Sequence, residues 1–174
     1  MQEIYVENIM EVVRGKSRIE DELEVKISNK GKNVFVDGNA DNEFVAIEIL
    51  EAVNCGFSVD VALKLKDEGT ILQRVHIKNI TKRGDLERIR GRIIGSKGRT
   101  LATLSKLTNC AISLKDNEVG LIGDAEKMDD AVQAVTSLVQ GSKQGNVYSR
   151  LEREGKKKRL QKGINIKNEL KENS

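Results

Sequence analysis

The chain has 174 residues, of which 38% are hydrophobic and 33% are charged, and its formal net charge is +3. This length suits one ordinary domain or two small ones, and the apolar content can fill their cores, so we expect a soluble globular protein. No apolar run approaches the roughly 18 residues of a membrane-spanning helix, and the acidic start does not resemble a signal peptide. A cytoplasmic location without a membrane partner is therefore predicted.

The first seventy residues contain short amphipathic segments separated by turn residues. They predict, in chain order, a strand (4–6), a helix (8–13), the turn Arg14-Gly15-Lys16-Ser17, a short helix from Arg18, a hairpin (23–28 and 34–38) and a helix (41–53). The stretch 56–69 predicts one further helix that links this part of the chain to the next.

From Thr70 the pattern of apolar residues is clearer. It predicts a strand (70–80), a helix (85–94) capped by Asp85, a glycine turn (95–98), a short helix with Leu101, Leu104 and Leu107 on one face, two strands (110–114 and 118–123) and a helix (124–141) capped by Asp124. Because the two halves share much of this order, an internal duplication is predicted. The tail from Arg150 has few apolar residues, and it is either a solvated helix or a segment disordered until bound.

Charge is strongly segregated along the chain. Residues 1–73 carry 8 basic and 15 acidic side chains, whereas residues 74–106 carry 10 and 2, and residues 150–174 carry 9 and 4. Positive charge concentrated in the glycine segment and in the tail indicates a polyanionic partner met at two places, and a solvated basic face is the alternative.

The glycines of this turn are expected to serve a specific purpose, because glycine inside a helix costs about 1 kcal/mol relative to alanine. A Gly-x-x-Gly turn between two helices lets a ligand approach the backbone, and the amides from Arg99 to Leu101 at the start of the second helix would have no intrahelical partners. These amides and nearby cations predict a phosphate site, beside which aliphatic side chains would form a groove for unstacked bases. The candidate RNA-binding residues are Arg90, Arg92, Ile93, Ile94, Gly95, Ser96, Lys97, Gly98, Arg99, Thr100, Leu101, Ile112 and Leu114.

The order strand, helix, Gly-x-x-Gly, helix, strand, strand, helix, with "RIIGSKGRTLATLSKLTNCAISL", resembles a K-homology (KH) domain of type I. The fold class implied is α+β, with two tandem type I KH domains (β-α-α-β-β-α), each a three-stranded antiparallel sheet covered by helices. The predicted divisions are a degenerate KH domain without the glycine pair (1–55), a linking helix (56–69), a KH domain with the Gly-x-x-Gly turn (70–142) and a basic extension (143–174).

Three further stretches, "RIRGRIIGSKGRT", "VGLIGDAEKMDDAVQAV" and "GSKQGNVYSRLE", resemble the archaeal branch of the partner-of-Nob (Dim-two) family of small-subunit ribosome assembly factors. The resemblance implies binding of single-stranded RNA from the 3′ region of small-subunit rRNA or its precursor. It also implies two protein partners, the endonuclease that matures that 3′ end and initiation factor two alpha. The family often has His where this chain has Gln144, so no specific contact is carried onto that residue.

Alternatives of other classes remain. A protein-interaction scaffold could use the KH folds as adaptors, with incidental RNA affinity supplied by the basic tail. An enzyme is disfavoured, because neither a Walker loop nor Gly-x-Gly-x-x-Gly is present, the single His76 lies in a strand, and the isolated Cys55 and Cys110 are expected to be reduced core residues. No metal site and no cofactor are predicted.

Overall fold

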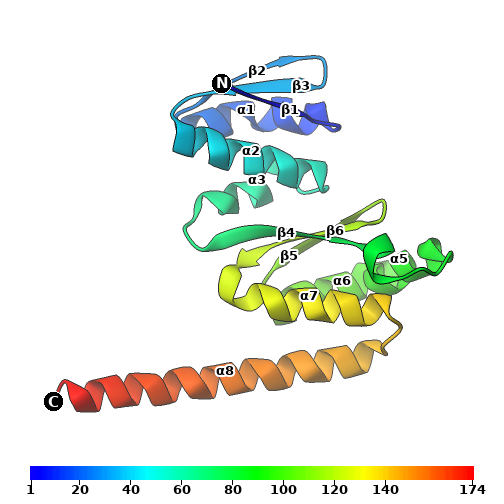
Figure 1. Cartoon of the computed structure of the whole chain (residues 1–174), viewed down its shortest axis with the longest axis vertical. Coiled ribbons are helices and arrows are strands. Elements are labelled where there is room, and N and C mark those ends of the chain that lie inside the picture. Colours follow the sequence, from blue (N-terminus) through cyan, green and yellow to red (C-terminus); the bar gives the residue numbers. More distant parts are fainter.

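The computed structural model describes residues 1–174 and has an α+β architecture with two three-stranded antiparallel sheets. We call residues 2–66 the N-terminal unit and residues 70–172 the C-terminal unit. Figure 1 shows the two units stacked along the long axis of the molecule, with α8 crossing beneath the C-terminal unit and extending past it.

The N-terminal unit packs two long helices against its sheet, whose strand order is β1-β3-β2. Its core contains the fully buried Ile19, Ile49 and Leu50 together with Val34 and Val36 of the central strand. The elements are β1 (Gln2–Tyr5), α1 (Ile9–Leu23), β2 (Lys26–Lys30), β3 (Asn33–Asp37), α2 (Ala40–Asn54), α3 (Val59–Ala62) and the 3-10 helix η1 (Leu63–Lys66).

The prediction of a turn at residues 14–17 is wrong, because α1 runs unbroken from Ile9 to Leu23. The N-terminal unit therefore has the order β-α-β-β-α before α3, and it lacks the second helix that the sequence predicted. Gly15 serves packing: a Cβ atom placed there would lie 2.6 Å from Val59 Cγ1 of α3. The glycine lets α3 approach α1 closely and does not turn the chain.

The segment expected to be one linking helix forms two short pieces, α3 and η1, and packs into the N-terminal core. Val59 and Leu63 are buried in the same cluster as Ile19 and Ile49, and Phe57 before α3 joins them. The capping hydrogen bond comes from Ser58, whose side-chain oxygen accepts from the Val61 amide at 3.3 Å.

The C-terminal unit has the sheet order β4-β6-β5 and a separate core around Ile77, Ile93 and Leu121. Asp85 and Asp124 occupy the positions before α5 and α7, as predicted, but their side chains make no capping hydrogen bond. The elements are β4 (Thr70–His76), α4 (Ile77–Ile80), α5 (Leu86–Ile94), the 3-10 turn η2 (Ser96–Gly98), α6 (Arg99–Thr108), β5 (Ala111–Lys115), β6 (Glu118–Asp124), α7 (Ala125–Val139) and α8 (Gln144–Glu172).

The strand predicted for residues 70–80 ends earlier than expected, at His76. Its partner strand β6 begins at Glu118, which pairs with His76, so no strand remains for the next residues to pair with. Ile77 instead donates its amide to Asn117 O at 2.9 Å, buries its side chain and starts the short α4.

The two faces of the second sheet contact different parts of the molecule. Val119 and Leu121 of β6 belong to the core under the helices, whereas Ile122 belongs to the N-terminal core. Gly120 permits the close approach on that outer face, because a Cβ atom there would lie 2.8 Å from Phe57 Cε2. The second sheet is therefore covered on one side by its own helices and on the other by the N-terminal unit.

The tail is helical, which answers a question that the sequence left open. The first turns of α8 bury Val147 and Leu151 against Leu104 and Leu138; full burial of such a side chain contributes about 1.5–3 kcal/mol. From Lys156 onward every residue of α8 is exposed. None of the helices combines the length and the apolar character that crossing a bilayer would require.

Candidate nucleic-acid interface

The Gly-x-x-Gly turn lies between α5 and α6 and has an unusual backbone. Gly95, Lys97 and Gly98 all have positive φ angles, of 75°, 54° and 73°. Such angles are costly for most residues with a side chain but not for glycine. The local sequence therefore forces α5 to stop at Ile94 and α6 to start at Arg99, with the turn projecting between them.

The two glycines of the turn are needed for different reasons. A Cβ atom on Gly95 would lie 2.1 Å from Thr100 Oγ1 and 2.8 Å from Thr100 N, so a side chain there would collide with the start of α6. A Cβ atom on Gly98 would meet nothing within 4 Å. Gly98 therefore leaves the outer surface of the turn open, where a ligand could reach the backbone.

Exposed polar and cationic side chains surround this open surface. Ser96, Lys97 and Arg99 are all exposed, and neither Lys97 nor Arg99 forms an ion pair within the chain. The expectation that the Arg99 amide is free is wrong, because it donates to Ser96 O within the turn. An incoming phosphate would therefore meet the cations and the remaining backbone at the turn, without a free amide at Arg99.

Arg92, a candidate phosphate contact, is half-buried and has an internal partner. Its Nη2 donates to Ser142 O at 2.7 Å. Gln144 completes the connection, since its Nε2 donates to Arg92 O at 3.2 Å and to the buried Thr100 Oγ1 at 2.8 Å. Arg92, Thr100 and Gln144 thus tie the start of α8 to the residues that flank the turn. The sequence did not reveal this link, because the partners lie more than 40 residues apart in the chain.

Arg90 also has an internal partner, on the other side of α5. Its Nη1 donates to Asn117 Oδ1 at 2.9 Å, at the turn between β5 and β6.

The guanidinium groups of Arg83 and Arg92 approach Gly141, within 3.8 Å and 3.5 Å of the position that its Cβ would take. Arg83 was absent from the predicted set, and the basic composition around the turn was the only signal for it.

The predicted aliphatic groove divides into accessible and inaccessible residues. Ile93 is fully buried in the core, whereas Ile94 is 39% exposed beside the turn. Leu101 of α6 and Ile112 and Leu114 of β5 are partly buried, and all three pack against the same core. Leu101 lies in the first turn of α6, which begins at the glycine turn, and α6 packs against the edge strand β5, so these residues lie on neighbouring elements.

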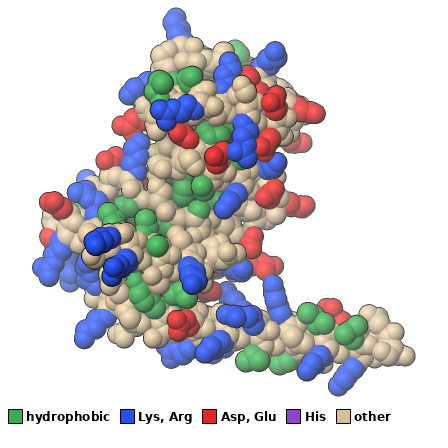
Figure 2. All heavy atoms as spheres, turned by 180° about the vertical axis from the view of Figure 1, so that it is seen from behind, with side chains coloured by type: hydrophobic (Ala, Val, Ile, Leu, Met, Phe, Trp, Pro, Cys, Tyr) green, Lys and Arg blue, Asp and Glu red, His purple; other side chains and the backbone are tan.

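Charges on the whole molecule follow the segregation along the sequence. Figure 2 shows many lysine and arginine side chains over the C-terminal unit and along α8, while acidic side chains gather mainly on the N-terminal unit. In the N-terminal unit several cations are paired, for example Lys66 with Glu22 at 2.6 Å. The surface that favours a polyanion therefore belongs to the C-terminal unit.

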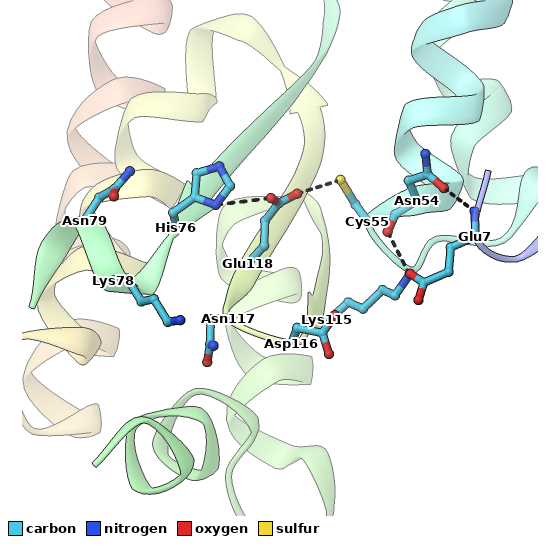
Figure 3. A pocket seen from close by; sticks show the side chains of 10 residues that line it. All are labelled: Glu7, Asn54, Cys55, His76, Lys78, Asn79, Lys115, Asp116, Asn117 and Glu118. Carbon is cyan, nitrogen blue, oxygen red and sulfur yellow. Dashed lines mark hydrogen bonds and ion pairs between the residues drawn. The ribbon is translucent and has the colours of Figure 1, made fainter. Parts of the chain in front are cut away.

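A polar cavity of about 550 Å³ lies where the two units meet (Figure 3). Most of its charged groups are already paired: Lys115 with Glu7, and His76 Nδ1 with Glu118 Oε2 at 3.2 Å. Cys55 Sγ donates to Glu118 Oε1 at 3.2 Å. The contacts of Lys115 with Glu7 and of Cys55 with Glu118 join the two units, and four of the charged or titratable side chains of the lining are engaged in pairs.

Neither cysteine is a candidate nucleophile. Both are buried and free of disulfides. Burial, and secondly the hydrogen bond to Glu118, raises the pKa of the Cys55 thiol to about 12. Burial likewise raises the pKa of Cys110. The reactive thiolate is therefore suppressed at neutral pH, and no cluster of three or more His, Cys, Asp or Glu side chains could hold a metal ion.

A family model for the second KH domain of the Pno1 type, described as a eukaryotic-type KH domain (KH-domain type I), matches residues 71–156. The crystal structure of Dim2p from Pyrococcus horikoshii OT3 is 30% identical, with a TM-score of 0.79, and the match covers 88% of this chain and 99% of that one. A complex of a/eIF2alpha, aDim2p and rRNA from the same organism contains a chain that is 28% identical, with a TM-score of 0.82 and coverage of 90% and 94%.

Among curated relatives, the pre-rRNA-processing protein PNO1 of Candida albicans is 31% identical over 137 residues, which cover 74% of this chain and 50% of that protein. The chain spans 40% to 66% of the length of the curated relatives it matches. These relatives are named for KH domains, RNA binding and pre-rRNA processing.

Proposed function

Because the chain belongs to the Pno1/Dim2 family of KH-domain proteins, we propose that it is a ribosome assembly and rRNA-processing factor that binds single-stranded RNA from the 3′ region of small-subunit rRNA or its precursor. The observation that carries the proposal is the exposed Gly95–Gly98 turn, with its unpaired Lys97 and Arg99, beside the aliphatic surface of α6 and β5. The turn would hold RNA phosphates, and the aliphatic surface would receive unstacked bases.

The N-terminal unit has a different proposed role. It lacks the glycine turn and carries an excess of acidic side chains, which would repel RNA. We assign it to protein contacts. The proposed partners are initiation factor two alpha, which accompanies the P. horikoshii relative in the rRNA complex, and the endonuclease of rRNA 3′-end maturation that the family resemblance implies.

The test is fluorescence anisotropy with single-stranded RNA from the mature 3′ end of small-subunit rRNA and a scrambled control, at several salt concentrations. The variant is Ser96→Asp/Lys97→Asp, which places negative charge at the turn. Asp tolerates the left-handed conformation of Lys97 better than most residues, so the fold should persist. We expect the affinity for the rRNA sequence to fall about tenfold or more, since phosphate contacts dominate RNA affinity.

The matched control is Ser105→Asp/Lys106→Asp, which makes the same change of charge at a Ser-Lys pair further along α6. Affinity close to that of the wild type is expected for the control with an RNA of about four nucleotides, which the turn alone would hold. If both variants bind equally, or if every RNA binds weakly and with the same salt sensitivity, the proposed clamp is wrong. The basic tail would then supply the affinity, and the KH folds would act as a protein scaffold.

A further inference from the structure

A second cavity, of about 560 Å³, lies between the middle of α8, the end of α6 and the start of α7, and it shares no residue with the junction cavity. We call it the tail groove. Leu107 at the end of α6 and Leu151 of α8 supply its apolar part, and Gly155 lies between Leu151 and the exposed half of α8. It is separate from the Gly95–Gly98 turn, which contributes no residue to it.

The charge of the tail groove favours an anion. Its lining has four cationic side chains and two carboxylates, and one of the carboxylates, Asp130, is neutralised by Lys158 at 2.5 Å. Lys162 forms no ion pair within the chain and stands at the exposed side of the groove. The junction cavity differs, because Glu7 pairs with Lys115 and Glu118 pairs with His76 there.

The uncharged lining suits a planar base. Gln161 Nε2 donates to Asn165 Oδ1 at 3.1 Å, which leaves Gln161 Oε1 as an acceptor and Asn165 Nδ2 as a donor for a base edge. The amide of Asn109 and the apolar side chains of Leu107 and Leu151 complete this part of the lining. Gly155 lies inside a helix, where glycine is unfavourable, and it lines the groove. Only Arg159 Nη2, at 3.7 Å, lies near the position that a Cβ atom would take, so the absence of a side chain keeps the groove open.

We propose that the tail groove binds one nucleotide of the same RNA strand that the Gly95–Gly98 turn holds, with the phosphate near Lys162 and the base over Leu107 and Leu151. This inference rests on the proposed function. Helix α6 joins the two places, since it starts at the turn and ends at the groove. Its ten residues span about 15 Å, a distance that a few nucleotides cover.

The groove also includes residues beyond the part of the chain that the KH family model matches. The family model ends at residue 156, whereas Lys158, Lys162 and Asn165 lie beyond it. The basic tail thereby gains a defined site in addition to its general charge. The groove would lengthen the RNA segment that the C-terminal unit binds, at the end of α6 opposite the turn.

The first experiment compares a short RNA of about four nucleotides, the span of a KH clamp, with RNAs extended at either end. Gly155→Leu fills the groove without changing charge, and Gly163→Leu is the control, because Gly163 lies in the same helix, in open space and outside the groove. We expect Gly155→Leu to weaken binding of one extended RNA about tenfold and to leave the short RNA unaffected, since contacts to one base are of this size.

Gly163→Leu should bind both RNAs like the wild type. Equal binding of the extended RNA by Gly155→Leu and wild type would overturn the inference while leaving the turn's role intact. The Ser96→Asp/Lys97→Asp variant with the short RNA reports on the turn alone, so failure of the proposed function appears as a separate result.

A second pair of variants, matched in charge, tests the inference even if Gly155→Leu does not fold. Lys162→Glu changes a groove residue, and Lys167→Glu changes an exposed lysine of the same helix outside the groove. A larger loss of extended-RNA affinity for Lys162→Glu supports the site, and equal losses would mean general electrostatic attraction and overturn it. Binding of a free nucleoside monophosphate as tightly as the RNA extension would also overturn it, in favour of a small-molecule site.

Discussion

The two units differ most in the helices that lie between the first and second strands of each sheet. The N-terminal unit uses the single helix α1, and its Gly15 has a helical backbone and lies against Val59. The C-terminal unit uses α5 and α6, and its Gly95 and Gly98 have positive φ angles in the turn between them. A glycine in such a segment can therefore serve packing or turn the chain, and the backbone angle and the neighbour of the missing Cβ distinguish the two.

The same contrast appears in the charges. Two cations of the N-terminal unit join its own elements: Arg18 pairs with Glu22 and Asp60, and Lys66 pairs with Glu22. Lys97 and Arg99 of the C-terminal unit have no such partners. Arg18 and Lys66 therefore hold elements of their own unit together, whereas Lys97 and Arg99 at the glycine turn are available to a ligand.

The largest expected effect on stability comes from Gly95→Ala. The new Cβ would overlap Thr100 at a left-handed backbone position, so we expect a loss of about 2–4 kcal/mol from strain and displacement of α6. Gly98→Ala is the control, because only its φ angle is unfavourable and its cost should be about 1 kcal/mol. Urea unfolding measures both, and equal losses would show that the collision with Thr100 is unimportant.

A smaller effect is expected from Gly15→Ala in the N-terminal unit. The new methyl group would collide with Val59 and push α3 from α1, at a cost of about 1–3 kcal/mol that the better helix propensity of alanine offsets by about 1 kcal/mol. Gly163→Ala in the exposed part of α8 should instead be neutral or stabilising. Urea unfolding and RNA anisotropy together test this, since lost RNA affinity in a folded Gly15→Ala protein would contradict a packing role.

The sequence predicted the C-terminal unit well because its signals are local. The spacing of Ile89, Ile93, Leu101 and Leu104 around the glycine pair specifies both helices and the turn. It failed at Gly15, because the reason for that glycine is a contact with Val59 in a distant element. It also missed the hydrogen bonds of Gln144, which depend on how α8 packs beside α5 and α6.

The smallest expected effect concerns the ion pairs of Glu22, and it depends on pH. Hydrogen bonding from Lys66, and secondly from Arg18, lowers the pKa of Glu22 below its usual 4.5. A carboxyl whose pKa is lowered by folding stabilises the protein above its unfolded pKa, and the contribution is lost as the pH falls through the folded pKa. Glu22→Gln should therefore be less stable than wild type at neutral pH, and the difference should shrink at acidic pH.

Glu24→Gln is the matched control, because Glu24 is exposed at the end of α1 and forms no ion pair. Its unfolding free energy should follow that of the wild type at both pH values. If Glu22→Gln also follows the wild type at neutral pH, the pairs with Lys66 and Arg18 contribute nothing net, as is common for exposed ion pairs. The acidic side chains of the N-terminal unit would then matter only through repulsion of RNA and attraction of a basic protein surface.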